Sequence, residues 1–320
     1  MAAVYPVSGA YATTPSYSGT FIPTLWASKM IAKFYAATVF GEIANTDYEG
    51  EIAGVGDKVV INGVPSIAIR DYVAGTNLQY DVPTPEALEL LIDKGKYFGF
   101  KVNDVLEYQS KPDLMNTFSS DAGEQMKVVI DRAVLKGVFN QAAAANMGAT
   151  AGAISGAYNL GTDAAPVALT GENVLQLITS LSSVLDEQNI PESDRFLVIS
   201  PQDRQILMQS NLANAQFIGD STAMQRNGKI GMIDRFTVYV SNQLPRAAAT
   251  QDFDGAAQAG AAKRHPILAG HKSAITFASQ ITKVEDLVDQ NDFGKLVRGM
   301  NVYGYKVVKG DALAMALVAG

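Results

Sequence analysis

The chain contains no cysteine and only two histidines among its 320 residues, so several kinds of functional site are hardly available to it. Without thiols it can form neither disulfides nor thiolate metal sites. His265 and His271 are six residues apart, on either side of a short predicted strand, and this spacing fits no helical metal pair. No acidic residue lies near them in the sequence to orient either ring. The sequence therefore predicts no metal and no cofactor.

Charge and long apolar runs are also scarce. Only 18% of the residues are charged, and the net charge of −7 argues against a nucleic-acid binder, which would normally carry a basic face. The C-terminal apolar run, 312–319, is too short to span a bilayer. Residues 1–19 have no basic segment followed by an apolar core, as a secretory signal would. We expect a soluble protein that is made in the cytosol and has no membrane partner.

Motifs of catalysis are missing as well. The one Gly-Lys pair that resembles a phosphate-binding loop, 228–229, is followed by Ile230 where a Ser or Thr must bind Mg²⁺. An acidic run, 285–294, lacks two of the ligands that a calcium loop needs. Ser155 has alanines where a nucleophile elbow needs glycines. The sequence thus predicts no catalytic residue.

Apolar residues, at 48%, are numerous enough for two or three packing units in a 34.0 kDa chain. Residues 1–20 are rich in small and turn-forming types, which favour irregular or extended backbone. Residues 21–40 have apolar positions near helical spacing. Spacings of three and four predict the longest helix, from Leu114 to Ala145, about 45 Å at 1.5 Å per residue. Its predicted apolar stripe consists of Met115, Phe118, Ala122, Met126, Val129, Ala133 and Gly137. Such a helix suggests an elongated subunit.

Between these helices the pattern is that of strands. Residues 58–61 and 66–72 predict the two limbs of a ribbon, and 87–102 predict a returning β segment. A two-stranded ribbon has little core of its own and is marginally stable in isolation. Neighbouring subunits would have to bury what it exposes. The predicted inter-subunit contacts, in the N-terminal segment and in this ribbon, are Tyr17, Phe21, Trp26, Ile67, Ile69, Arg70, Asp71 and Tyr72.

The second half of the chain alternates helix and strand. A helix from Thr170 to Pro191 is predicted, then a buried strand over 195–200. Ser200, Pro201 and Asp203 predict the start of another helix, through an N-cap, an N1 proline and a first-turn acid. Gly228 and Gly231 predict a turn into a strand that stops near Asn242. The closing strands are predicted at 266–269, 274–278, 296–308 and 313–318. The fold class is therefore α+β.

The segment 228–245, GKIGMIDRFTVYVSNQLP, resembles one that recurs in major capsid proteins of tailed bacteriophages with the HK97-like fold. The chain departs from that pattern at Arg235, where the family usually has glycine. Further similarities, to P22-like podophage relatives above all, occur in the same order along nearly the whole chain. They are found at 21–26, 48–61, 93–102, 114–145 and 269–281.

The resemblance implies a division of the chain into five parts. They are an N-terminal arm with a short helix (1–42), the E-loop and its return strand (43–102), a P-domain spine helix and linker (103–169), an A-domain (170–265) and the closing strands of both domains (266–320).

The resemblance also implies an icosahedral shell of hexamers and pentamers around a double-stranded DNA genome, bound without sequence specificity. The implied partners are a separate scaffolding protein, a portal protein and an optional decoration or cement protein. The location would be the virion, assembled in the bacterial cytoplasm. Some relatives join subunits by Lys–Asn isopeptide links, but Lys58 lies at the base of the arm, so we expect a non-covalent shell.

Two other interpretations stay open at this point. The first is an encapsulin-type nanocompartment, which shares the architecture and encloses protein cargo. The second is an α/β enzyme built on residues 170–270.

Overall fold

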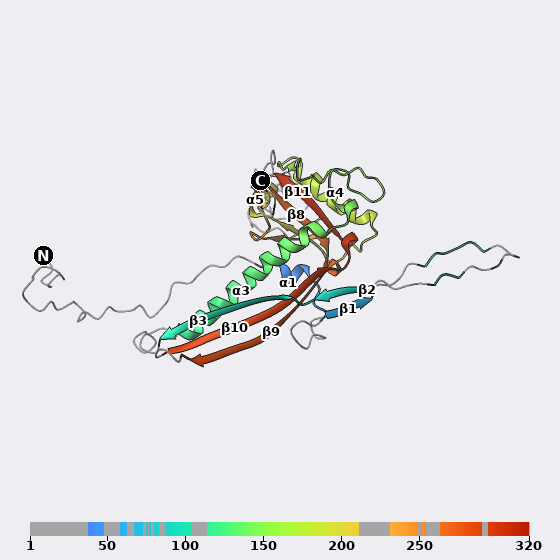
Figure 1. Cartoon of the computed structure of the whole chain (residues 1–320). Coiled ribbons are helices and arrows are strands. Elements are labelled where there is room, and N and C mark those ends of the chain that lie inside the picture. Colours follow the sequence, from blue (N-terminus) through green and yellow to red (C-terminus); the bar gives the residue numbers. More distant parts are fainter. Residues whose placement is uncertain are drawn as a thin grey trace, which may run out of the picture.

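The computed structural model describes residues 38–47, 58–62, 67–72, 75, 77, 80–82, 87–103, 114–210, 231–248, 251, 253, 263–289 and 294–319. These residues form an elongated molecule with three parts (Figure 1). A compact body contains a six-stranded sheet, a long helix and a three-stranded sheet run out of the body side by side, and a two-stranded arm leaves in another direction.

The sheet of the body has the strand order β4-β11-β8-β5-β7-β6. It is mixed: β8 is antiparallel to both β11 and β5, whereas β5 and β7 are parallel. The strands are β4 (Val167–Ala168), β5 (Arg195–Ile199), β6 (Met232–Ile233), β7 (Phe236–Val240), β8 (Arg264–His271) and β11 (Leu313–Ala319). The helices of the body are α4 (Val174–Glu187) and α5 (Pro201–Met208).

The central strands consist mainly of buried apolar residues because both faces of the sheet are covered. In β5, Phe196 and Val198 join the core on the side of the long helix, whereas Leu197 and Ile199 join the core under α4. Side chains alternate in this way because successive residues of a strand point to opposite faces. The predicted strands 195–200 and 313–318 are confirmed as β5 and β11.

The long helix, α3, spans Leu114–Val138 and is followed by two short 3₁₀ turns, Phe139–Gln141 and Ala144–Asn146. The predicted helix is thus confirmed but ends seven residues earlier than expected. Its predicted apolar stripe included Val129, which is 42% exposed. That part of the prediction is wrong: the fully buried face of the second half carries Ile130, Val134, Leu135 and Val138 instead.

A three-stranded antiparallel sheet with the order β3-β10-β9 lies along α3 (Figure 1). Its strands are β3 (Lys94–Asn103), β9 (Ile275–Val288) and β10 (Gly294–Val307). Helix and sheet are joined where the hydroxyl of Tyr305 donates to the carbonyl of Ala133 at 3.0 Å. A Cβ atom on Gly137 would overlap the Tyr305 ring, so only glycine allows this approach.

The arm begins with a ribbon of β1 (Lys58–Asn62) and β2 (Ala87–Leu91), which are antiparallel. The predicted return segment 87–102 is therefore two strands, because the chain leaves the ribbon at Ile92 and enters the other sheet as β3. Residues 67–72, predicted as a strand, have no strand pairing in the described part of the arm.

The predicted helix over 21–40 lies mostly outside the described residues. The helix α1 (Phe40–Ile43) begins at the last residue of that prediction.

Of two predicted local features of the body, the helix cap is confirmed and the turn differs. Ser200 and Asp203 form the predicted cap, a reciprocal capping box at α5. The turn directly before β7 falls at Asp234, with φ of 47°, and not at Gly231, so 232–240 is a hairpin of β6 and β7. Gly228, the other glycine of the predicted turn, lies outside the described residues.

Residues 146–169 form a hydrogen-bonded loop. In that loop the backbone N–H groups of Ile154 and Ser155 donate to the Glu187 carboxylate.

Candidate subunit interfaces

Most of the large apolar side chains described in the arm are exposed. Its base is anchored by one small cluster of Ile61, Leu90, Ile92, Ala278 and Val302. Beyond the ribbon, five large apolar side chains are mostly in contact with solvent: Ile67 (61% exposed), Ile69 (94%), Tyr72 (77%), Tyr80 (85%) and Val82 (87%). Exposed apolar surface of this extent marks a place where another surface docks.

Two ion pairs hold the limbs of the arm together. At the base, Lys58 Nζ lies 2.7 Å from Glu89 Oε1, and this hydrogen bond together with the charge of Lys58 lowers the pKa of Glu89. Farther out, the guanidinium of Arg70 lies 2.7 Å from Asp81 Oδ1. The predicted contact residue Arg70 is therefore engaged within its own arm, whereas its neighbour Asp71 is exposed.

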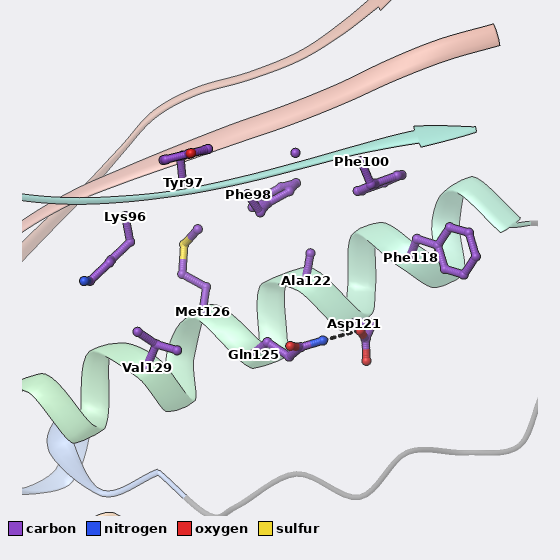
Figure 2. A pocket seen from close by; sticks show the side chains of 11 residues that line it. Lys96, Tyr97, Phe98, Phe100, Phe118, Asp121, Ala122, Gln125, Met126 and Val129 are labelled. Atoms are coloured by element: carbon purple, nitrogen blue, oxygen red, sulfur yellow. Dashed lines mark hydrogen bonds between the residues drawn. The ribbon is translucent and has the colours of Figure 1, made fainter. Parts of the chain in front are cut away.

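A groove of about 420 Å³ runs between β3 and α3 (Figure 2). Phe98 and Phe100 point from the strand toward the helix, and Phe118 meets Phe100 edge to face, with their ring centroids 5.9 Å apart. Met126 reaches from the helix toward the strand. Phe118 and Met126 are only half-buried, so the first half of the predicted apolar stripe lines an open groove instead of a closed core.

The opposite face of the same sheet carries a second hollow, of about 330 Å³. Tyr97, 83% exposed, and Met300, 39% exposed, contribute apolar surface to it. Beside them Arg298 donates to Glu285 through Nε (2.9 Å) and Nη2 (2.6 Å). The three-stranded sheet thus offers apolar surface on both of its faces.

A buried polar cluster in the body brings together residues that are far apart in the sequence. His265 Nε2 lies 2.8 and 2.9 Å from the Asp203 carboxylate oxygens and 3.2 Å from Ser200 Oγ. An acidic residue therefore does orient this ring, from 62 residues away. Ser, His and Asp meet here, but Nε2 faces both partners and all three residues are almost fully buried, so the serine is not presented to a substrate. The cluster secures the start of α5.

The remaining predicted sites are placed as follows. Tyr17, Phe21 and Trp26 lie outside the described residues. Within the described ranges, no group of three or more His, Asp or Glu side chains could hold a metal ion. None of the helices described is long and apolar enough to cross a membrane.

The groove between β3 and α3 was not predicted from the sequence. Its signal was present, since Phe98 and Phe100 are two residues apart on a strand and Phe118 and Met126 are eight apart on a helix. What was missing was the information that these two faces meet and leave space between them.

Comparison with known proteins agrees with this architecture. The profile of the family described as "Phage capsid protein" matches residues 85–318. The structure resembles a solved structure of Mycobacterium phage Che8. The two chains are 27% identical, with a TM-score of 0.72 and coverage of 93% of this chain and 97% of the other. It also resembles the capsid of cyanophage P-SCSP1u (19% identity, TM-score 0.69, 94% of each chain).

A third resemblance is to the capsid of Ralstonia phage GP4, with 11% identity, a TM-score of 0.66 and coverage of 97% of this chain and 98% of the other. No curated protein matches the sequence.

The family profile covers most of the chain, and the similar structures extend over both the arm and the body. The chain therefore belongs to the phage capsid protein family: it has the α+β, HK97-like fold and is a structural protein of a tailed-phage shell.

Proposed function

We propose that this chain assembles into an icosahedral shell of pentamers and hexamers in which each arm lies on a neighbouring subunit. The observation that carries the proposal is the row of exposed apolar side chains on the arm, from Ile67 to Val82. The hollows on the two faces of the three-stranded sheet supply apolar surface of the kind that such an arm could cover.

The energetic argument is simple. Full burial of one large apolar side chain stabilises by roughly 1.5–3 kcal/mol. Covering the five exposed side chains of the arm would therefore contribute on the order of 10 kcal/mol per subunit, before the entropy of association is subtracted. Because every subunit of a closed shell makes the same contact, even a modest surplus per contact is multiplied over the particle.

The contact residues that we propose are Ile67, Ile69, Asp71 and Tyr72, with Arg70 supporting the arm through Asp81. The N-terminal residues Tyr17, Phe21 and Trp26 are proposed as a second set of contacts. We also propose the five-part division of the chain: N-terminal arm, E-loop, spine, A-domain and closing strands. In this division β3 belongs to the sheet that it shares with β10.

We further propose that the shell encloses double-stranded DNA without sequence-specific binding and that the protein is not an enzyme. The net charge of −7 disfavours tight contact with DNA. The burial of Ser200 and His265 disfavours catalysis at that cluster. Scaffolding, portal and decoration proteins are the proposed partners, and the bacterial cytoplasm is the proposed place of assembly. The similarity to phage capsids favours DNA over protein cargo.

The test replaces residues 63–77 with a short Gly/Ser turn that leaves Lys58 and Glu89 in place. The body should stay folded, because the ribbon contributes little to the core. Shells should disappear from electron micrographs and from the fast-sedimenting fraction. A second variant, with Ile67, Ile69 and Tyr72 changed to serine, should show the same loss.

A matched control changes Met232→Ser, an apolar residue of the body that is 71% exposed. This control should still form shells. Normal shells from both arm variants would show that the arm is not the contact.

A further inference from the structure

A buried carboxylate holds together parts of the chain that are far apart in sequence. Asp131, on α3, is fully buried. Its Oδ1 accepts hydrogen bonds from the backbone N–H groups of Val39 (3.0 Å) and Phe40 (2.9 Å), more than 90 residues earlier. Val39 is the N-cap of α1 and supplies no side-chain cap of its own, so Asp131 provides the cap from another element.

The surroundings of Asp131 form a junction of three elements. Val39 and Ile43 pack into the core beside α3, where Val134 is also fully buried. The next residue of α3, Arg132, donates from Nε to the side-chain oxygen of Gln243, just beyond β7, at 2.8 Å. Two adjacent residues of α3 thus fasten the start of the described chain on one side and the exit of β7 on the other.

The burial of the Asp131 carboxylate lowers the stability of the folded protein. Among the described residues its second oxygen, Oδ2, has no hydrogen bond of normal geometry. Burial raises the pKa of Asp131 above its ordinary value, and the backbone bonds to Val39 and Phe40 and the nearby Ser241 hydroxyl oppose this only in part. An asparagine would have nearly the same shape and would carry no charge. A buried charge that is costly to stability is a candidate for a role in specificity.

We propose that Asp131 is a positioning residue for assembly, because it holds residues 38–43, which follow the N-terminal residues 1–37 in the chain, in one orientation on the body. The proposal rests on the proposed function, in which the N-terminal segment contacts a neighbouring subunit. An ionised carboxylate makes a stronger and more directional bond to N–H than an amide does. It therefore holds the backbone at Val39 and Phe40 in one orientation, with some loss of stability.

The first test is hydrogen exchange at the amides of Val39 and Phe40 in the full chain. Asp131→Ala should speed their exchange by at least about tenfold, the factor that corresponds to the loss of one typical hydrogen bond. Asp131→Asn, which keeps an acceptor, should speed it less. Glu124→Gln, on the same helix but in an exposed pair with Lys127, is the matched control and should change nothing.

The second test is the pH dependence of the unfolding temperature, which a merely space-filling role would not affect. A carboxyl whose pKa is higher in the folded state binds more protons folded than unfolded between pH 3.8 and its folded pKa. Its contribution to stability is therefore complete below pH 3.8 and is lost as the pH rises through the folded pKa. Asp131→Asn should be more stable than wild type at pH 7.5, and the difference should shrink toward pH 4.

Other titratable groups on the packed elements are Glu42 on α1, Arg132 on α3, Tyr239 on β7 and Tyr305 on β10. These groups are the same in both proteins, so their contributions to the pH dependence cancel when Asp131→Asn is compared with wild type. An equal pH slope for both proteins, or unchanged exchange of Val39 and Phe40 in Asp131→Ala, would overturn the proposal. If Asp131→Ala fails to fold, Asp131→Asn decides instead, because the amides of Val39 and Phe40 should still exchange faster in that variant than in wild type.

Assembly separates this proposal from the one on which it rests. Folded Asp131→Ala subunits should form misshapen shells or none, and so should a chain that lacks residues 1–37. If the truncated chain forms normal shells, the N-terminal segment is not a contact and the proposed function fails at that point, whatever the exchange data show. If truncation abolishes normal shells but Asp131→Ala does not disturb them, the positioning role is wrong.

Discussion

The six-stranded sheet of the body and the two-stranded arm are both β structures, but they are stabilised in different ways. In β5, β8 and β11 nearly every side chain is buried, and alternate residues belong to the two cores on either side of the sheet. The arm has a core of five residues at its base, and most of its large apolar side chains face solvent.

The difference separates the residues on which folding depends from those that we propose as contacts in assembly. The body buries most of its large apolar side chains in its own two cores, so we expect it to fold as an isolated subunit. The arm cannot, since a two-stranded ribbon has only one partner strand for each strand and no covering layer. A change in the body should therefore be measured as lost folding, and a change in the arm as lost assembly.

The largest expected effect is a difference in stability between one variant of the body and one of the arm. Leu197→Ala, at a fully buried position of β5, should lower the free energy of unfolding of the isolated subunit by about 2–5 kcal/mol. Ile69→Ala, at a position 94% exposed, should change it by less than about 0.5 kcal/mol. Urea denaturation of unassembled subunits measures both values.

Sedimentation of assembly reactions should then show the reverse order, with Ile69→Ala impairing shell formation despite its normal stability. Equal stability losses in the two variants would show that the arm packs on its own body in solution.

A smaller loss of stability is expected from a change where the arm meets the three-stranded sheet. Gly304, on β10, lies against the carbonyl of Leu91 in β2, and a Cβ atom there would overlap that backbone oxygen. Gly304→Ala should therefore push the ribbon from the sheet and destabilise by about 1–3 kcal/mol. Gly95→Ala, on the neighbouring strand β3 with open space around its Cβ, is the matched control. Thermal unfolding of both variants tests this, and equal melting temperatures would contradict the close contact.

The sequence predicted the body better than the arm for a physical reason. A continuous apolar run such as 196–199 is satisfied only by burial on both faces, so the strand follows directly. The ribbon carries weaker signals, and nothing in 87–102 announces that the chain changes sheets at Ile92. That change depends on the pairing of β3 with β10, some 200 residues later.

The polar groups of the candidate sites were the least predictable, because their partners are distant in sequence. The cap formed by Ser200 and Asp203 is local and was predicted. The contact of Asp203 with His265 and the bonds of Asp131 to Val39 and Phe40 are not local, and they were missed.

Arg235 shows the same limit. It departs from the family pattern in sequence, and only the structure shows that it meets the carboxylates of Asp186 and Glu192 at 3.1 Å.

The smallest expected effect concerns Lys58, at the boundary between arm and body. Its ammonium group pairs with Glu89 on the opposite strand of the ribbon, with both side chains about half exposed, so the pair contributes little stability. In that position the lysine is directed to its own ribbon and not across a subunit boundary, and the chain has no cysteine for disulfides. We therefore expect a non-covalent shell. Boiled particles should run as a single 34 kDa band on a denaturing gel, with or without reducing agent, and Lys58→Ala should leave that band and the melting temperature unchanged. A ladder of multimers that survives boiling in wild type and disappears in Lys58→Ala would show that this lysine does cross-link neighbouring subunits.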